Sequence, residues 1–211
     1  MSSEKTIDFY FSFISLYTYI GYEAFQDLAK RHNLKINYKP IDLHEIFQLS
    51  GGLPVSKRPP QRQSYRLVEM QRWSHTREIP LVLKPKHHPA NPEIGHRMLL
   101  AALENQQNVV EFIGNALKIL WVDDRNIEDH KIIVAAANRA GLDGKALYEQ
   151  SLNPKYIDQL TQITNEAFER QVFGTPFFIY RGEPFWGQDR LEMLEDLITS
   201  GRQPINPPNL L

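Results

Sequence analysis

The chain has 211 residues, of which 42% are hydrophobic and 11% aromatic, enough to bury one substantial core. Its net charge of −1 excludes a general attraction to nucleic acid or to a membrane surface. Cysteine is absent, which excludes disulfide bonds and redox chemistry by the protein's own thiols. The first residues lack an apolar signal segment and no run approaches about 18 apolar residues, so we expect a soluble, cytoplasmic protein.

The chain opens with a strand, a helix and a second strand. Residues 6–13 are mostly apolar and aromatic, which is typical of a buried strand. Residues 17–32 carry an apolar helical stripe, and residues 34–38 alternate before Pro40. Such short joins predict a right-handed β-α-β unit with parallel strands. Ser15 would then lie at the carboxyl end of the first strand, the usual place of ligand sites, although a helix N-cap explains its hydroxyl equally well.

The middle of the chain has helical patterns only. We predict a helical insertion over residues 42–170, between the two parts of a discontinuous domain formed by residues 1–41 and 171–211. Residues 79–92 are rich in proline and should form an extended connection. Helices are predicted over residues 44–49, 61–77, 97–105, 109–122, 129–140, 145–152 and 156–171.

The last part of the chain predicts a hairpin followed by a helix. Residues 177–180 form an apolar run, Arg181-Gly182-Glu183 suits a tight turn, and residues 183–186 can form the return strand. The final helix should cover residues 191–199. Asp189, or Gln188, stands where its N-cap would lie.

Thr175-Pro176, just before the hairpin, is the most informative pair. Proline lacks the N–H that a sheet needs, so it suits the start of a strand, and the bond before it is where a cis peptide is found. A cis bond would turn the backbone N–H and C=O of Thr175 outward, toward an extended, peptide-like ligand. The start of the following helix, at Gln188 and Asp189, would offer a second polar anchor. An ordinary trans proline is the alternative.

Positive charge is concentrated in one segment. Residues 56–97 hold nine Lys or Arg against three Glu, which favours a small anionic ligand, although solvated helix faces would look the same. Arg72, beside Trp73, is a better ligand candidate than Arg66 or Arg77, because an aromatic neighbour lowers local solvation. The histidines lack the spacing of a metal site, so we expect no metal. No phosphate-binding glycine loop or serine-hydrolase motif occurs.

A β-α-β unit, a helical insertion and a final strand, strand and helix, with proline before the third strand, make an α/β thioredoxin-like domain with a large all-helical insertion. The motifs also resemble the 2-hydroxychromene-2-carboxylate isomerase family, which is related to DsbA-like proteins and kappa-class glutathione transferases. The resemblance rests on Asp8-Phe-Tyr-Phe-Ser-Phe-Ile-Ser15-Leu-Tyr-Thr-Tyr19, Gln71-Arg72-Trp73, Ile79-Pro80-Leu81, Val172-Phe-Gly-Thr-Pro176 and Phe185-Trp-Gly-Gln-Asp-Arg190.

This resemblance implies glutathione as the cofactor, with Ser15 where redox relatives keep a cysteine. A hydroxyl that donates to the glutathione sulfur would favour its thiolate, which in the family adds reversibly to a conjugated enone and allows cis–trans isomerisation. The substrate would be a small anionic aromatic molecule from an aromatic degradation pathway. The resemblance also implies a homodimer.

The matched positions imply ligand roles for nine further residues. Those assigned to glutathione are Thr175, Pro176, Gln188, Asp189, Lys57 and Trp186, and those assigned to the substrate are Arg58, Arg72 and Trp73. Two positions depart from the family pattern: Leu16 replaces a proline after the serine, and Ser12 replaces a common aspartate. The departures concern the start of the first helix and the substrate contacts.

Two other functions fit the same residues. A kappa-type glutathione transferase or peroxidase would use the same thiolate against an electrophile or a hydroperoxide. A non-catalytic thioredoxin-like binding module would use Ser15 only as a helix cap. A disulfide oxidoreductase is excluded, because the chain has no thiols.

Overall fold

A computed structural model describes residues 5–208. Its strands are β1 (Thr6–Phe11), β2 (Lys35–Pro40), β3 (Phe177–Tyr180) and β4 (Glu183–Trp186). Its helices are α1 (Leu16–Arg31), α2 (Leu43–Ser50), α3 (Pro60–Arg77), α4 (Glu93–Glu104), α5 (Val110–Trp121), α6 (His130–Arg139), α7 (Gly144–Ser151), α8 (Lys155–Glu169) and α9 (Leu191–Thr199), with short 3-10 turns η1 (Val55–Lys57) and η2 (Gln188–Arg190).

The sheet has the strand order β2-β1-β3-β4. β1 pairs parallel with β2 and antiparallel with β3, and β4 pairs antiparallel with β3. The predicted β-α-β unit and hairpin are therefore confirmed. The hairpin is tight because Arg181 and Gly182 both have positive φ, 52° and 86°, a turn that matches the twist of the strands and favours glycine.

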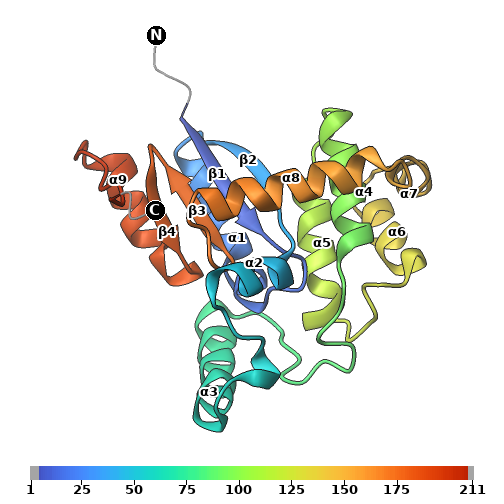
Figure 1. Cartoon of the computed structure of the whole chain (residues 1–211), viewed down its shortest axis with the longest axis horizontal. Coiled ribbons are helices and arrows are strands. Elements are labelled where there is room, and N and C mark those ends of the chain that lie inside the picture. The colour runs from blue at the N-terminus through green and yellow to red at the C-terminus, as the bar shows by residue number, and fades with distance from the viewer. Residues whose placement is uncertain (1–4, 209–211) are drawn as a thin grey trace.

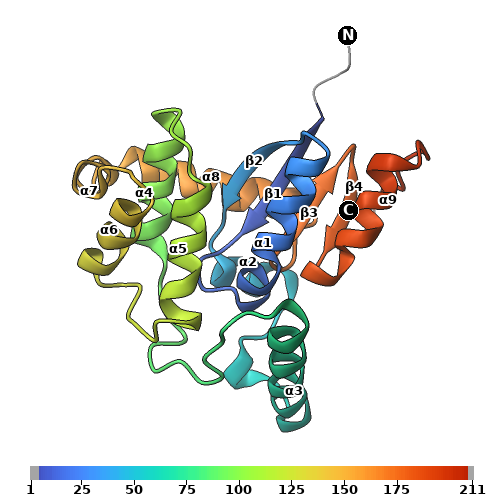
Figure 2. The ribbon, with the colours of Figure 1, turned by 180° about the vertical axis from the view of Figure 1, so that it is seen from behind.

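Both faces of the sheet are buried, because strand side chains alternate between them. Phe9 and Phe11 belong to the larger core, which includes α1 and the helices α4 to α7. Tyr10, between them, belongs to a smaller core formed with α2 and α8. Figure 1 shows α8 and α2 across one face, and Figure 2 shows α1 on the other, with α9 at the β4 edge.

The helices α4 to α7 pack beside the sheet, and α5 lies against α1. The start of α4 was predicted wrongly: the helix begins at Glu93, directly after Pro92, four residues before the predicted residue 97. A proline is tolerated at a helix start because the first N–H groups have no partner within the helix. The prolines of residues 79–92 therefore concealed the first turn of α4.

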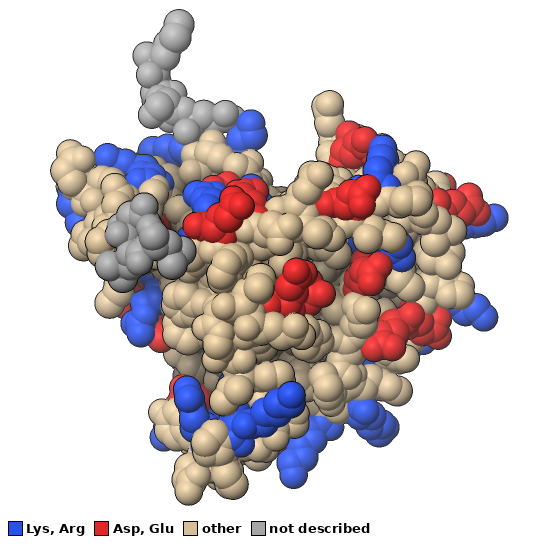
Figure 3. All heavy atoms as spheres, viewed as in Figure 1, with Lys and Arg blue, Asp and Glu red and all other residues tan. Residues whose placement is uncertain are grey.

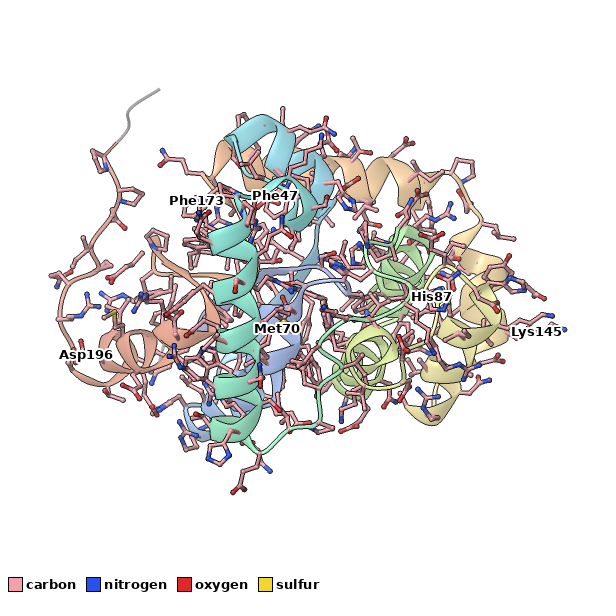
Figure 4. The ribbon with its side chains drawn as sticks, turned by 90° about the horizontal axis from the view of Figure 1, so that it is seen from below. Phe47, Met70, His87, Lys145, Phe173 and Asp196 are labelled. Atoms are coloured by element: carbon pink, nitrogen blue, oxygen red, sulfur yellow. The ribbon has the colours of Figure 1, made fainter. Side chains whose placement is uncertain are left out.

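The helix α3 stands apart from the sheet and buries only Met70. Figure 4 labels Met70 beside this helix. Figure 3 shows Lys and Arg gathered over this lower part of the molecule, where the sequence predicted a basic segment. Within residues 5–208, the helices are all too short or too polar to cross a membrane.

Candidate functional site

Ser15 lies between β1 and α1, and its hydroxyl makes two hydrogen bonds. Its oxygen caps α1 by accepting the Thr18 N–H at 3.2 Å. The same hydroxyl donates to the carbonyl oxygen of Thr175 at 3.3 Å. This distance is longer than most O–H···O bonds, so a better acceptor from a ligand can take over the single hydroxyl proton.

The Thr175-Pro176 bond is cis. The Pro176 carbonyl accepts the N–H of Gly187 at 2.9 Å, which fixes the segment against the end of β4. The hydroxyl of Thr175 is buried and has no hydrogen-bond partner among the described residues. Ser15 and Thr175 thus bring two hydroxyls and a carbonyl to one point, where the sequence predicted a ligand.

A cavity of about 370 Å³ begins at this point and extends toward α2 and α3. Its walls are largely apolar, and its basic side chains are those of Arg58, Arg66, His44 and His88. Among the described residues that line it there is no Asp or Glu. The apolar lining includes Ile14, Leu16, Leu43, Phe47, Pro54 and Val55.

The two arginines of this cavity have no carboxylate partner within the part of the chain that the structure describes, residues 5–208. Burial and the nearby charge of Arg58 lower the pKa of Arg66, whose guanidinium lies 5.6 Å from the centre of the Trp121 ring and donates to Met70 Sδ at 3.1 Å. Arg58 donates to the Leu53 carbonyl at 2.7 Å. Its pKa is lowered mainly by burial and then by the positive charge of Arg62. A half-buried cation without a counter-ion is stabilised by an anionic ligand.

A second cleft, of about 530 Å³, opens from the first. The two share Tyr17, Arg58, Arg66, Thr175 and Trp186. The second cleft continues between α3 and the turn after β4, so a ligand in one can touch a ligand in the other. It adds Gln61, Arg62, Tyr65, Glu69, Trp73, Gly187, Gln188, Asp189 and Arg190.

Most of the predicted site residues lie together. Ser15, Thr175, Arg58 and Trp186 line the first cavity, and Pro176 is buried directly behind Thr175. The second cleft contains Trp73, Gln188 and Asp189. Seven of the ten predicted residues therefore line one pair of joined cavities, and Pro176 is next to one of the seven in the chain.

Lys57 and Arg72 lie outside the lining of both cavities. Arg72 is 60% exposed, and its guanidinium pairs with Glu69 at 2.6 Å and lies over the Tyr65 ring. Arg66, which the sequence ranked below Arg72 as a ligand candidate, lines both cavities. Neighbours in a helical sequence point about 100° apart, whereas residues three or four apart share a face.

The predicted N-cap at Gln188 or Asp189 was also wrong. These residues form η2, which runs into α9, and no side chain caps either helix. The Gln188 side chain is buried and accepts a hydrogen bond from Arg77 at 3.0 Å. Asp189 lies 3.3 Å from the guanidinium of Arg190. Only Asp189 of these two therefore presents a charged group to the second cleft.

The sequence reasoning missed Arg66, Tyr17, His44 and His88 as lining residues. Helical spacing places Arg66 on one face of α3 with Arg62 and Trp73, and the structure shows that all three line the second cleft. The histidines come from segments far apart in the chain, and only the packing brings them together.

The turn that carries Ser15 is held by a histidine from α4. Phe13 N–H donates to Nε2 of His96 at 3.1 Å, and the Ser15 N–H donates to the Ser12 carbonyl at 3.0 Å. β1 therefore ends at Phe11, two residues before the predicted end. Burial lowers the pKa of His96 to about 3, so its Nε2 remains an acceptor at neutral pH.

Protonation of His96 should oppose folding. The unfolded chain protonates this group below about pH 6.5, whereas the folded protein keeps it neutral down to about pH 3. Stability should therefore fall as the pH drops through this window, by about 1.4 kcal/mol per pH unit. Urea unfolding of His96→Asn, which keeps an acceptor but does not titrate, should show a shallower dependence on pH. His87→Asn, at an exposed histidine in the connection before α4, should keep the wild-type slope. Equal slopes for all three proteins would contradict this assignment.

Comparisons with known proteins agree with this arrangement. The model of the DSBA-like thioredoxin domain matches residues 6–199. A 2-hydroxychromene-2-carboxylate isomerase of Sphingobium xenophagum is 30% identical over 92% of this chain and 98% of its own length. The kappa 1 glutathione S-transferase of Caenorhabditis elegans is 27% identical, with 91% and 90% covered.

A solved 2-hydroxychromene-2-carboxylate isomerase superposes with a TM-score of 0.78 at 26% identity, over 92% of this chain and 95% of that one. The predicted thioredoxin-like fold with helical insertion is thereby confirmed. Both kinds of relative are named as enzymes, which supports an enzymatic function. The chain belongs to the family of DSBA-like thioredoxin domains that includes the 2-hydroxychromene-2-carboxylate isomerases.

Proposed function

We propose that this protein is a glutathione-dependent cis–trans isomerase that acts on a small, anionic, conjugated aromatic compound of the 2-hydroxychromene-2-carboxylate type. The observation that carries the proposal is the Ser15 hydroxyl, which faces the Thr175 carbonyl where two cavities meet, in a chain without cysteine. A thioredoxin-like protein with a hydroxyl at this place needs a thiol from elsewhere.

The second cleft suits glutathione. The backbone of Thr175, next to Pro176, would hold the cysteinyl part, and Asp189 would meet the ammonium of the γ-glutamyl end. The long Ser15–Thr175 bond leaves the Ser15 hydroxyl and the Thr175 carbonyl as polar groups that a peptide-like ligand can satisfy. Gln188 and Trp186 would contribute contacts along the way. Lys57 has no place in this arrangement.

The first cavity suits the substrate. Its apolar walls would hold an aromatic ring, and Arg58 and Arg66 would bind a carboxylate. Trp73 would lie at the glutathione side, and Arg72 has no role because it is turned away. Arg66 can also stabilise negative charge that develops on a carbonyl oxygen of the substrate.

Bound glutathione would supply a thiolate that adds reversibly to the conjugated double bond and so permits rotation. Ser15 would donate its proton to hold the sulfur as an anion, and the N-terminal end of α1 would add a favourable field. The residues of the first cavity would orient the substrate against that sulfur and exclude water.

Calorimetric titration with glutathione, followed by turnover of 2-hydroxychromene-2-carboxylate, tests the proposal. Conjugation of chlorodinitrobenzene without isomerisation would favour a kappa-class transferase, an alternative supported by the kappa relative. A protein that does not bind glutathione at all would contradict both enzymes and favour a non-catalytic binding module.

A further inference from the structure

One group in the wall of the first cavity has no role in the proposed function. His88 comes from the connection between α3 and α4 and lines the cavity together with Ser15 and Arg66. Its ring packs against Trp121, with the ring centres 5.0 Å apart. The Arg66 guanidinium lies 5.6 Å from the centre of the same indole.

The indole of Trp121 is fully buried at the end of α5. It is therefore a fixed support for two side chains that reach the cavity from different segments. A buried aromatic ring restricts the rotamers of the groups that pack on it, so His88 and Arg66 are held in place before a ligand arrives.

The charges around His88 are all of one sign. Burial, Arg66 from α3 and His44 from α2 together lower the pKa of His88 to about 4, so the ring is neutral at pH 7. Arg58 is the other charged group of the lining, and no carboxylate occurs among its described residues. An anionic group in this cavity would meet an uncompensated guanidinium and a neutral imidazole with one N–H to donate.

We propose that His88 and Arg66, both supported by Trp121, form a subsite for one carboxylate of the electrophile, and that His88 makes the cavity selective for carboxylates over neutral compounds. The proposal rests on the proposed function in placing the electrophile in this cavity. It does not require glutathione, because the carboxylate would bind to the protein alone.

The subsite has a pH signature. A bound carboxylate favours the protonated form of a nearby imidazole, so the pKa of His88 should rise on binding. Binding should therefore take up a proton and become tighter as the pH falls from about 7 to about 5, toward the pKa of about 4 in the free protein. The carboxylate of the ligand stays ionised throughout this range.

The test is calorimetric titration with phenylpyruvate in the absence of glutathione, with benzylideneacetone as the neutral ligand. At about pH 6, His88→Phe should weaken phenylpyruvate binding about tenfold, the effect of one charge-assisted hydrogen bond, and leave benzylideneacetone within about twofold. The phenyl ring still packs on Trp121 but cannot donate. His87→Phe changes an exposed neighbour, labelled in Figure 4, and should match the wild type for both ligands.

His88→Asn is the second variant, because it keeps a neutral donor but cannot take up a proton. It should bind phenylpyruvate nearly as well as the wild type at about pH 7 and lose the tightening at about pH 5. Equal weakening of both ligands by His88→Phe, or no weakening of either, would overturn the subsite. A wild type that binds phenylpyruvate but not glutathione would overturn the proposed function alone.

Discussion

Ser15→Ala should leave glutathione bound but remove most of its thiolate. Ser15 is 6% exposed, and its hydroxyl donates to the carbonyl of Thr175. We expect the glutathione sulfur to lie beside this pair. A hydrogen bond to a charged group is worth about 1.5–3 kcal/mol, so its loss should reduce the thiolate fraction near neutral pH about tenfold to a hundredfold. Ultraviolet absorbance measures the thiolate fraction, and calorimetric titration measures glutathione binding. Turnover should fall with the absorbance.

The control must account for the second role of Ser15. Its oxygen caps α1, and loss of such a cap costs about 1 kcal/mol of stability. Asp143 caps α7 in the same way, accepting the Ala146 N–H at 2.9 Å, and lies outside both cavities. Asp143→Ala should lower the Tm by a similar amount with full activity. An unchanged thiolate signal in Ser15→Ala would reduce Ser15 to a helix cap.

The elements around Ser15 could be predicted because their signals are local. The β-α-β unit follows from apolar patterns and short joins, and the hairpin follows from Arg181-Gly182, which suits the φ values that the turn requires. These two motifs fix the outer strand pairs, β2 with β1 and β3 with β4, and the fold class places β1 beside β3 at the centre. The meeting of Ser15 with Thr175, 160 residues apart in the chain, then follows from the fold class.

The part of the first cavity that is lined by Arg58, Arg66 and His88 could not be predicted in the same way. The helix α3 buries only Met70, so its apolar pattern is too weak to show which face points inward. Trp121 and His88 come from distant segments, and their contact with Arg66 depends on how α3 packs. Composition revealed that the segment is basic, but only the packing shows which of its cations face a ligand.

Arg66→Met should reduce kcat/KM for a carboxylate substrate about tenfold to a hundredfold, mainly through KM. Arg66 is partly buried, faces both cavities and has no carboxylate partner among residues 5–208, so its charge is available to the substrate, and one or two charge-assisted hydrogen bonds account for the loss. Methionine keeps much of the packing of the arginine stem. Chlorodinitrobenzene carries no carboxylate, so its conjugation by the same variant should change much less.

Arg72→Met is the matched control on the same helix. Arg72 is largely exposed and already paired with Glu69, and surface ion pairs of this kind contribute little. The variant should keep kcat/KM within about twofold for both substrates, since the exposed pair is screened by solvent. Steady-state kinetics of the two variants decides which face of α3 binds the substrate carboxylate. Thermal unfolding confirms that both variants are folded. A larger loss for Arg72→Met than for Arg66→Met would place the carboxylate site on the exposed face and would separate it from the cavity that begins at Ser15.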